Sequence, residues 1–213
     1  MITLTPVLER WSDCPFWPVD QPDFFVSVPR RPTSLQVATV VWTLIGRGLT
    51  ADDLSVSATE PAAAIEEYLT SEDGDFAPGG LRVAAGDVVI DPGCCVGLDE
   101  WRDWLRVPGG AVIDLGHDPD VLVEHRGPVV RVWKDKSRLL PGEEPGPGDE
   151  HIDVPREALP GLLGAVRDDL AGFLAALRPW AQGVVGELAD PLVTAVDRRL
   201  RISAPLGLWP TET

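Results

Sequence analysis

The chain has 213 residues, of which 44% are hydrophobic and 24% are charged. These values suit one well-buried core and exclude disorder of the whole chain. Asp and Glu number 34 against 18 Lys and Arg, which gives a formal net charge of −16. A field of that sign repels nucleic-acid phosphates and anionic membranes, and it attracts basic proteins. We therefore expect a basic protein partner, no nucleic-acid partner and no membrane partner.

The cysteines indicate the compartment. Cys14, Cys94 and Cys95 make a poor disulfide framework, because their number is odd and two of them are adjacent. We expect three reduced thiols, as in the cytoplasm. The N-terminus lacks the regions of a signal peptide, and the longest apolar stretch, residues 37–45, is too short to span a bilayer. These features predict a cytoplasmic protein.

The N-terminal part of the chain predicts one strand and two helices. Prolines forbid a helix through residues 11–32, where a short strand is expected at 24–28 and the aromatic side chains are expected to cover the core. Apolar residues at helical spacing predict a helix over 33–46, with a hydroxyl residue as its N-cap and a glycine at its end. A second helix is predicted at 61–69, with proline at its first position.

The middle of the chain predicts a hairpin and an antiparallel meander. Residues 81–83 and 88–90 flank an Ala-Gly-Asp turn and are expected to pair. Strands are predicted at 111–115, 121–125 and 129–133, and the turns between them are short enough to require antiparallel neighbours.

The C-terminal third predicts two helices. Apolar residues repeat at three- and four-residue steps over 159–177 and again over 180–200, and Pro179 is expected to end or kink the first helix. Before them, the Pro-, Gly- and acid-rich segment 135–153 predicts a flexible acidic loop. We therefore predict a single α+β domain over residues 1–213, with an antiparallel sheet packed by helices on one face and a helical C-terminal third.

The candidate chemistry lies in two turns. Cys94 and Cys95 precede a helix predicted at 98–105, whose N-terminal dipole favours a thiolate. His117 and Asp118 lie in a later turn. If the sheet brings these turns together, a thiol nucleophile could meet an imidazole base. The alternative is that both thiols are small buried hydrophobic groups, and no local protease or amidase signature surrounds them. No catalytic residue is therefore assigned outright.

A zinc site is a further option for the same residues. Cys94, Cys95, His117 and His125 are all possible ligands. Adjacent cysteines fit poorly with the usual spacing of about two to four residues between ligands. The sequence therefore predicts no metal site and no cofactor.

The predicted helix at 98–105 also carries candidate binding residues. Trp101 and Trp104 cannot both point inward with equal ease on an α-helix, so one of them is expected to border a surface groove. A tryptophan there could anchor a partner, with Asp99 and Glu100 facing its basic residues. The alternative for each tryptophan is packing in the core.

Three segments carry a resemblance. Over residues 81–173 the chain resembles a group of uncharacterised proteins of high-GC bacteria. The segments that carry the resemblance are DPGCCVGLDEWRDW, LGHDPDVLVEHRGPVVRVW and PREALPGLL. The resemblance implies no activity. In charge and fold class the chain is also loosely similar to immunity proteins of bacterial toxin systems.

Three functions remain open at this point. The leading hypothesis is a non-enzymatic acidic binding protein, of the immunity-inhibitor or adaptor type, for a basic protein. The first alternative is a cysteine-dependent hydrolase or transferase that uses Cys94 or Cys95 with His117. The second is an accessory structural subunit that docks through the aromatic N-terminal segment.

Overall fold

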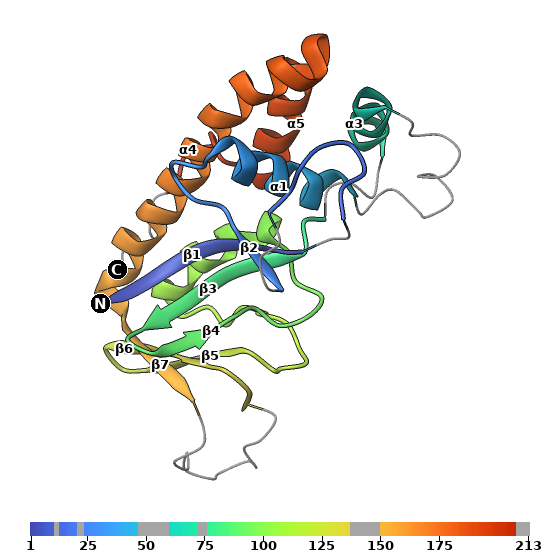
Figure 1. Ribbon diagram of the computed structural model, residues 1–213. Coiled ribbons are helices and arrows are strands. Elements are labelled where there is room, and N and C mark those ends of the chain that lie inside the picture. Colours follow the sequence, from blue (N-terminus) through green and yellow to red (C-terminus); the bar gives the residue numbers. More distant parts are fainter. Residues whose placement is uncertain (11–12, 21–23, 47–59, 72–75, 137–149, 208–213) are drawn as a thin grey trace. The chain divides into compact units, whose positions relative to one another are not determined.

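A computed structural model describes residues 1–10, 13–20, 24–46, 60–71, 76–136 and 150–207 (Figure 1). The chain divides into two compact units, and β1 and α4 contribute residues to both. Unit 1 comprises residues 1–6, 78–167 and 205–213, and unit 2 comprises residues 7–77 and 168–204. The predicted α+β class is confirmed, because antiparallel sheets accompany a helical C-terminal third. The expected single domain stays a prediction.

The first sheet of unit 1 contains the predicted hairpin. Strand β3 (Gly79–Ala85) pairs with β1 (Ile2–Glu9) on one side and antiparallel to β4 (Val88–Ile90) on the other. Gly86 in the turn has φ 60°, a left-handed conformation that glycine adopts without steric cost. The sequence prediction placed the hairpin correctly but assigned no strand to β1, whose Pro6 argues against a central strand.

The second sheet of unit 1 contains two strands of the predicted meander and one strand that was not predicted. Its order is β5 (Leu122–Arg126), β6 (Val129–Trp133) and β7 (His151–Pro155), all antiparallel. The predicted acidic loop at 135–153 was wrong at its end, because residues 151–153 belong to β7. Residues 137–149 of that loop lie outside the described residues.

The strand predicted at 111–115 does not form. Asp114 makes one isolated antiparallel bridge to Leu122 and no ladder follows from it. The Asp114 carboxylate instead accepts a hydrogen bond from the Gly116 N–H at 2.9 Å. Such a local side-chain bond offers the backbone an alternative to a sheet ladder, and here it turns the chain away.

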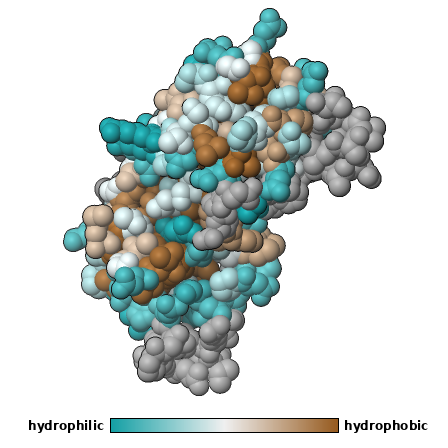
Figure 2. All heavy atoms as spheres, in the orientation of Figure 1, coloured by the Kyte–Doolittle hydropathy of each residue, from teal (hydrophilic) through white to brown (hydrophobic). Residues whose placement is uncertain are grey.

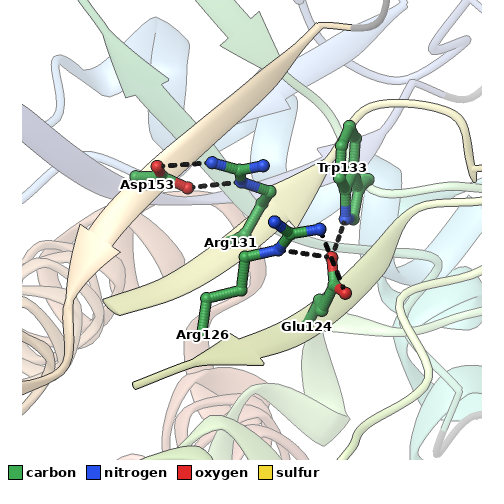
Figure 3. Close-up of polar contacts among 5 residues, drawn as sticks. All are labelled: Glu124, Arg126, Arg131, Trp133 and Asp153. Carbon is green, nitrogen blue, oxygen red and sulfur yellow. Dashed lines mark hydrogen bonds and ion pairs between the residues drawn. The ribbon is translucent and has the colours of Figure 1, made fainter. Parts of the chain in front are cut away.

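A row of alternating charges crosses the second sheet (Figure 3). Arg131 lies opposite both Glu124 on β5 and Asp153 on β7, and it donates two hydrogen bonds to Asp153, at 2.7 and 2.8 Å. Glu124 accepts from the Trp133 indole at 2.8 Å and pairs with Arg126 at 3.2 Å. Each charge therefore has an opposite charge beside it, which stabilises cross-strand pairing.

The segment predicted as a helix at 98–105 is a 3₁₀ helix, η3 (Leu98–Gly109), which packs on β3. A 3₁₀ helix has 3.0 residues per turn, so residues three apart lie on one face. The residues that η3 buries have this spacing: Leu98, Trp101, Trp104 and Val107. The helix ends at Gly110, whose φ of 92° is left-handed.

Unit 2 is mainly helical. Thr33 begins α1 (Ser34–Ile45) with a capping box, in which its hydroxyl accepts from the Gln36 N–H at 3.2 Å and the Gln36 side chain accepts from the Thr33 N–H at 2.9 Å. Helix α3 (Pro61–Thr70) packs against α1. Among its described residues, unit 2 also contains α5 (Ala189–Leu200) and the C-terminal part of α4 (Leu159–Val185). A strand, β2 (Phe25–Ser27), pairs with residues 7–9 of β1.

The expectation that Pro179 ends the first C-terminal helix was wrong, and the alternative that it kinks the helix stays a prediction. Helix α4 continues through Pro179, and the break falls at the 3₁₀ turn Gly186–Leu188, where Gly186 has φ 55°. Pro179 is exposed, whereas Leu177 and Ala181 on either side of it are fully buried. Burial of one continuous apolar face therefore outweighs the hydrogen bond that proline removes.

The buried guanidinium group of Arg199 links two helices of unit 2. Arg199 of α5 is 7% exposed and donates to the carbonyl of Tyr68, on α3, at 2.7 Å. Its guanidinium carbon lies 3.7 Å from the centroid of the Tyr68 ring. A hydrogen bond and a cation–π contact thus join α5 to α3.

Two aromatic residues of the N-terminal segment, Phe16 and Trp17, pack over the core as predicted, whereas Phe24 is exposed. Phe16 and Trp17 both meet Trp42 of α1, and Trp17 also meets Trp180 at 5.2 Å between ring centroids. The Trp17 indole donates to the carbonyl of Ala38 at 3.0 Å. These rings cover the core of unit 2.

The exposed apolar residues are scattered. Among the described residues, the large exposed ones outside the first residue include Phe24, Phe76 and Val112, which are far apart in sequence. On the face drawn in Figure 2, hydrophilic residues separate several smaller hydrophobic areas. No described helix combines the length and apolar character needed to cross a bilayer.

Candidate dithiol–imidazole site

Two turns of unit 1 meet at Cys94 and His117. The Cys94 N–H donates to the carbonyl of His117 at 2.6 Å, and the His117 N–H donates to the carbonyl of Cys94 at 3.2 Å. A third bond, from the Gly93 N–H to the carbonyl of Leu115 at 2.8 Å, extends the contact. The juxtaposition on which the sequence argument depended is therefore present.

Two glycines make this approach possible. A Cβ added at Gly93 would lie 2.6 Å from the carbonyl carbon of Gly116 and from the carbonyl oxygen of Pro119. A Cβ at Gly116 would lie 2.5 Å from the carbonyl carbon of Gly93, and Gly116 has φ 92°. Both contacts are with backbone, which cannot rotate away as a side chain can. The two turns pack this closely only because neither position carries a side chain.

The backbone at Cys95 brings the two thiols together. In extended chain, successive side chains point to opposite sides. Cys95 has φ 69°, in the left-handed region, which breaks this alternation. The two Sγ atoms lie 2.9 Å apart, and both cysteines are exposed. The alternative that both thiols are buried hydrophobic groups is therefore wrong.

His117 completes the cluster. One ligand atom each from Cys94, Cys95 and His117 lies within 4.8 Å of the others. The Nδ1 atom of His117 lies 3.1 Å from Oδ2 of Asp118. This hydrogen bond to Asp118, followed by the hydrogen bond and charge of Cys95, raises the pKa of the His117 imidazole above its usual range. The imidazole and its carboxylate are both exposed, so bulk water reaches the cluster.

The site contains a thiol from Cys95, an imidazole from His117 and a carboxylate from Asp118. Because a carboxylate only accepts hydrogen bonds, the bond to Asp118 assigns the proton of the neutral ring to Nδ1 and leaves Nε2 as its acceptor. Of the two thiols, Cys95 is the one that raises the pKa of the imidazole. The third cysteine, Cys14, lies outside this cluster, and partial burial raises the pKa of its thiol.

His125, the fourth residue considered for zinc, is not part of the cluster. Its Nε2 lies 2.9 Å from the carbonyl of Ala111, and its Nδ1 lies 3.3 Å from a guanidinium nitrogen of Arg156. Both ring nitrogens are engaged in these contacts. A four-residue site that includes His125 is therefore wrong, because the ring is committed elsewhere in unit 1.

The predicted binding surface on residues 98–105 differs from expectation. Trp101 and Trp104 are 1% and 2% exposed, so neither borders a surface groove. The 3₁₀ period of η3 turns both rings inward, which the α-helical interpretation did not allow. Asp99 and Glu100 lie in the first turn of η3, half-buried and exposed respectively. Their role in binding a basic partner stays a prediction.

A cavity of about 610 Å³ in unit 1 was not foreseen from the sequence. It is rich in proline, and Arg156 and Glu157 contribute the charged side chains. The Nε atom of Arg156 is buried without a hydrogen bond. The lining residues are Pro108, Gly127, Pro128, Val129, Pro155, Arg156, Glu157 and Pro160. They come from η3, from the turn between β5 and β6, from the strands β6 and β7 and from residues 156–160, so no local motif could have indicated the cavity.

Comparison with known proteins gives partial similarity. The aspartate–tRNA(Asp/Asn) ligases of two strains of Mycobacterium leprae, Br4923 and TN, are each 31% identical to this chain over 121 residues. The match covers 53% of this chain and 20% of each ligase, so the chain spans about a fifth of the length of these curated relatives. No family model matches the sequence. No solved structure matches it either.

Proposed function

We propose that this protein is a cysteine-dependent enzyme of the hydrolase or transferase class, acting in a reducing compartment such as the cytoplasm. Cys95 is the nucleophile, His117 is the base and Asp118 orients the imidazole. The observation that carries the proposal is the cluster itself, in which exposed thiols lie within 4.8 Å of an imidazole that is hydrogen-bonded to a carboxylate. A thiol needs such a neighbour to become an effective nucleophile near neutral pH.

The reaction proceeds by acyl transfer. The proton of the Cys95 thiol passes to His117, and the sulfur attacks the carbonyl carbon of an ester, thioester or amide. The leaving group departs with the proton from His117, which leaves an acyl thioester on Cys95. Water or a second nucleophile then attacks the thioester and regenerates the thiol. Cys94 takes no part in these bonds.

The first test is the rate at which each cysteine is alkylated in the native full chain. The reductant is removed just before the assay. At pH 7, iodoacetamide should modify Cys95 at least about tenfold faster than Cys14, because Cys95 is exposed beside His117 whereas burial raises the pKa of the Cys14 thiol. Mass spectrometry of the digested protein assigns the rate to each thiol. Equal rates for Cys95 in the wild type and in His117→Asn would overturn the role of His117.

The matched control is the neighbouring thiol. Cys94→Ser keeps the Cys95–His117 contact, so it should keep fast alkylation of Cys95 and turnover of a chromogenic thioester. Cys95→Ser should lose both. If the thioester is turned over equally by Cys95→Ser, Cys95 is not the nucleophile.

A second function is favoured by the charge. The net charge of −16 complements a basic protein and speeds encounter with it. We propose non-catalytic binding of such a protein, of the inhibitor or adaptor type, with Asp99 and Glu100 in the contact. Affinity for a basic protein recovered at low salt should fall steeply as salt rises, and Glu100→Lys should weaken it. Salt-independent capture would count against this function.

A further inference from the structure

We propose that Cys94, Cys95 and His117 form a binding site for a thiophilic divalent cation of the Zn²⁺ class, with one coordination position open. This inference goes beyond the proposed function, since a nucleophile needs one thiol whereas the metal site needs both. Two thiolates and one imidazole are a ligand set that zinc accepts, and a set of three protein ligands leaves a fourth position for water or substrate.

The spacing of the ligand atoms suits a tetrahedral ion. Zinc binds sulfur at about 2.3 Å and imidazole nitrogen at about 2.0–2.1 Å, so tetrahedral ligand atoms lie roughly 3.3–3.8 Å from one another. Here the three atoms lie within 4.8 Å of one another. The two Sγ atoms, at 2.9 Å, need to move apart slightly, and rotation about the Cα–Cβ bonds of two exposed cysteines allows that.

The objection from sequence was that adjacent cysteines have the wrong spacing. That objection assumes a backbone on which neighbouring side chains diverge. The left-handed φ of Cys95 removes the divergence, and the antiparallel bridge from Cys94 to His117 supplies the third ligand from a distant turn. The frame is set by main-chain hydrogen bonds and by two closely packed glycines, so it does not depend on the ion.

Asp118 supplies the outer contact that such sites usually have. A histidine that binds a metal commonly donates its other ring N–H to a carboxylate, which fixes the ring and raises its basicity. The Nδ1 atom of His117 makes this contact with Asp118 at 3.1 Å, which leaves Nε2 for the ion. His125 is not a fourth ligand, because both of its ring nitrogens are engaged elsewhere.

The test titrates the reduced full chain with Co²⁺ and then with Zn²⁺ under anaerobic conditions. We expect one ion per chain, thiolate-to-cobalt charge-transfer absorption, and displacement of Co²⁺ by Zn²⁺. Loss of the carboxylate that hydrogen-bonds a metal-binding histidine typically lowers metal affinity by about 10–100-fold, so Asp118→Asn should weaken Zn²⁺ binding by about tenfold. Removal of one of the three ligands should weaken Zn²⁺ binding further. The ligand variants are Cys94→Ser, Cys95→Ser and His117→Asn.

Matched controls remove a thiol and an imidazole outside the site. Cys14→Ser and His151→Gln should bind Zn²⁺ as the wild type does, in competition with a chromophoric chelator. Circular dichroism of each variant checks that it is folded. Wild-type affinity in Cys94→Ser, or a Co²⁺ spectrum without thiolate absorption, would overturn the site.

The two proposals fail separately. Fast alkylation of Cys95 in metal-free protein, together with no Zn²⁺ binding, would keep the nucleophile and remove the metal site. Tight Zn²⁺ binding with ordinary alkylation rates would do the reverse. Cys94→Ser is the decisive variant, because it should lose the ion and retain the reactive thiol.

Discussion

The main chains of Cys94 and His117 bond to each other in both directions, at 2.6 and 3.2 Å. This pair is the link between the turn that carries both exposed thiols and the turn that carries the imidazole and its carboxylate. Because the link is made by backbone groups, it does not itself use the side chain of either residue.

The close approach of Gly93 and Gly116 gives the first prediction. Gly93→Ala places a Cβ 2.6 Å from backbone of the facing turn, so the two turns must separate. Overpacking of this kind costs about 1–3 kcal/mol, and we expect that loss in the free energy of unfolding measured by urea denaturation. Cys95 should also lose its fast alkylation. Gly207→Ala is the control, because no atom lies within 4 Å of the added Cβ and the residue has no left-handed φ, and an equal loss there would argue against the clash.

The second prediction concerns the cation that joins α5 to α3. Arg199→Met keeps most of the volume but leaves the carbonyl of Tyr68 without this donor and removes the cation–π contact. We expect a loss of about 1–3 kcal/mol in the free energy of unfolding. Arg199→Lys should recover only part of it, since an ammonium cannot reproduce a planar guanidinium stacked on a ring. Unchanged stability in both variants would contradict this role.

The ion pair between Arg131 and Asp153 predicts a dependence on pH. Hydrogen bonds from Arg131 hold the pKa of Asp153 below its usual range. A lowered folded pKa means that the stabilisation is complete above the unfolded value, near about 3.9, and is lost as pH falls through the folded value. Asp153→Asn should therefore be less stable than the wild type at pH 7, and the difference should shrink below about pH 4.

Chemical denaturation at pH 7, 5 and 3 measures this difference. Asp13→Asn is the control, because its carboxylate is 83% exposed and its pair with Arg10 has water around it. A difference between Asp153→Asn and the wild type that stays constant from pH 7 to pH 3 would exclude the pair as its source.

The capping box of α1 gives the fourth prediction. Thr33→Ala removes the hydroxyl that accepts from the Gln36 N–H. Loss of such a cap costs about 1 kcal/mol, so the midpoint of thermal unfolding should fall. Thr33→Ser should retain nearly all of the stability, and a fall of equal size in Thr33→Ser would mean that the methyl group matters instead.

The sequence predicted those elements whose signals are local. Strand β6 has the residues expected of it, 129–133, because it is a run rich in valine that follows a short turn after β5. Helix α1 carries its own capping residues and an apolar run. Strand β1 was missed because Pro6 masks its pattern, and the break after α4 was misplaced because Pro179 gives the stronger local signal although Gly186 ends the helix.

For the candidate site, the sequence predicted the reactive residue types but not the contact between them. The residue types at 94, 95, 117 and 118 indicated thiol chemistry, but their contact depends on a bridge between distant turns and on glycine packing that no local pattern encodes. The wrong prediction that Trp101 or Trp104 borders a surface groove came from assuming an α-helix at residues 98–105. With 3.6 residues per turn the two rings diverge, and with 3.0 they share a face.

Neither compact unit is continuous in sequence, since unit 1 takes residues 78–167 from between the two parts of unit 2. On the ribosome, the residues of both sheets of unit 1 are therefore made before those of α5. Helix α3, which packs against α5, has to wait for this partner until the C-terminal part of unit 2 has been made. A ribosome that stalls between residues 168 and 189 would hold a chain in which α3 still lacks α5.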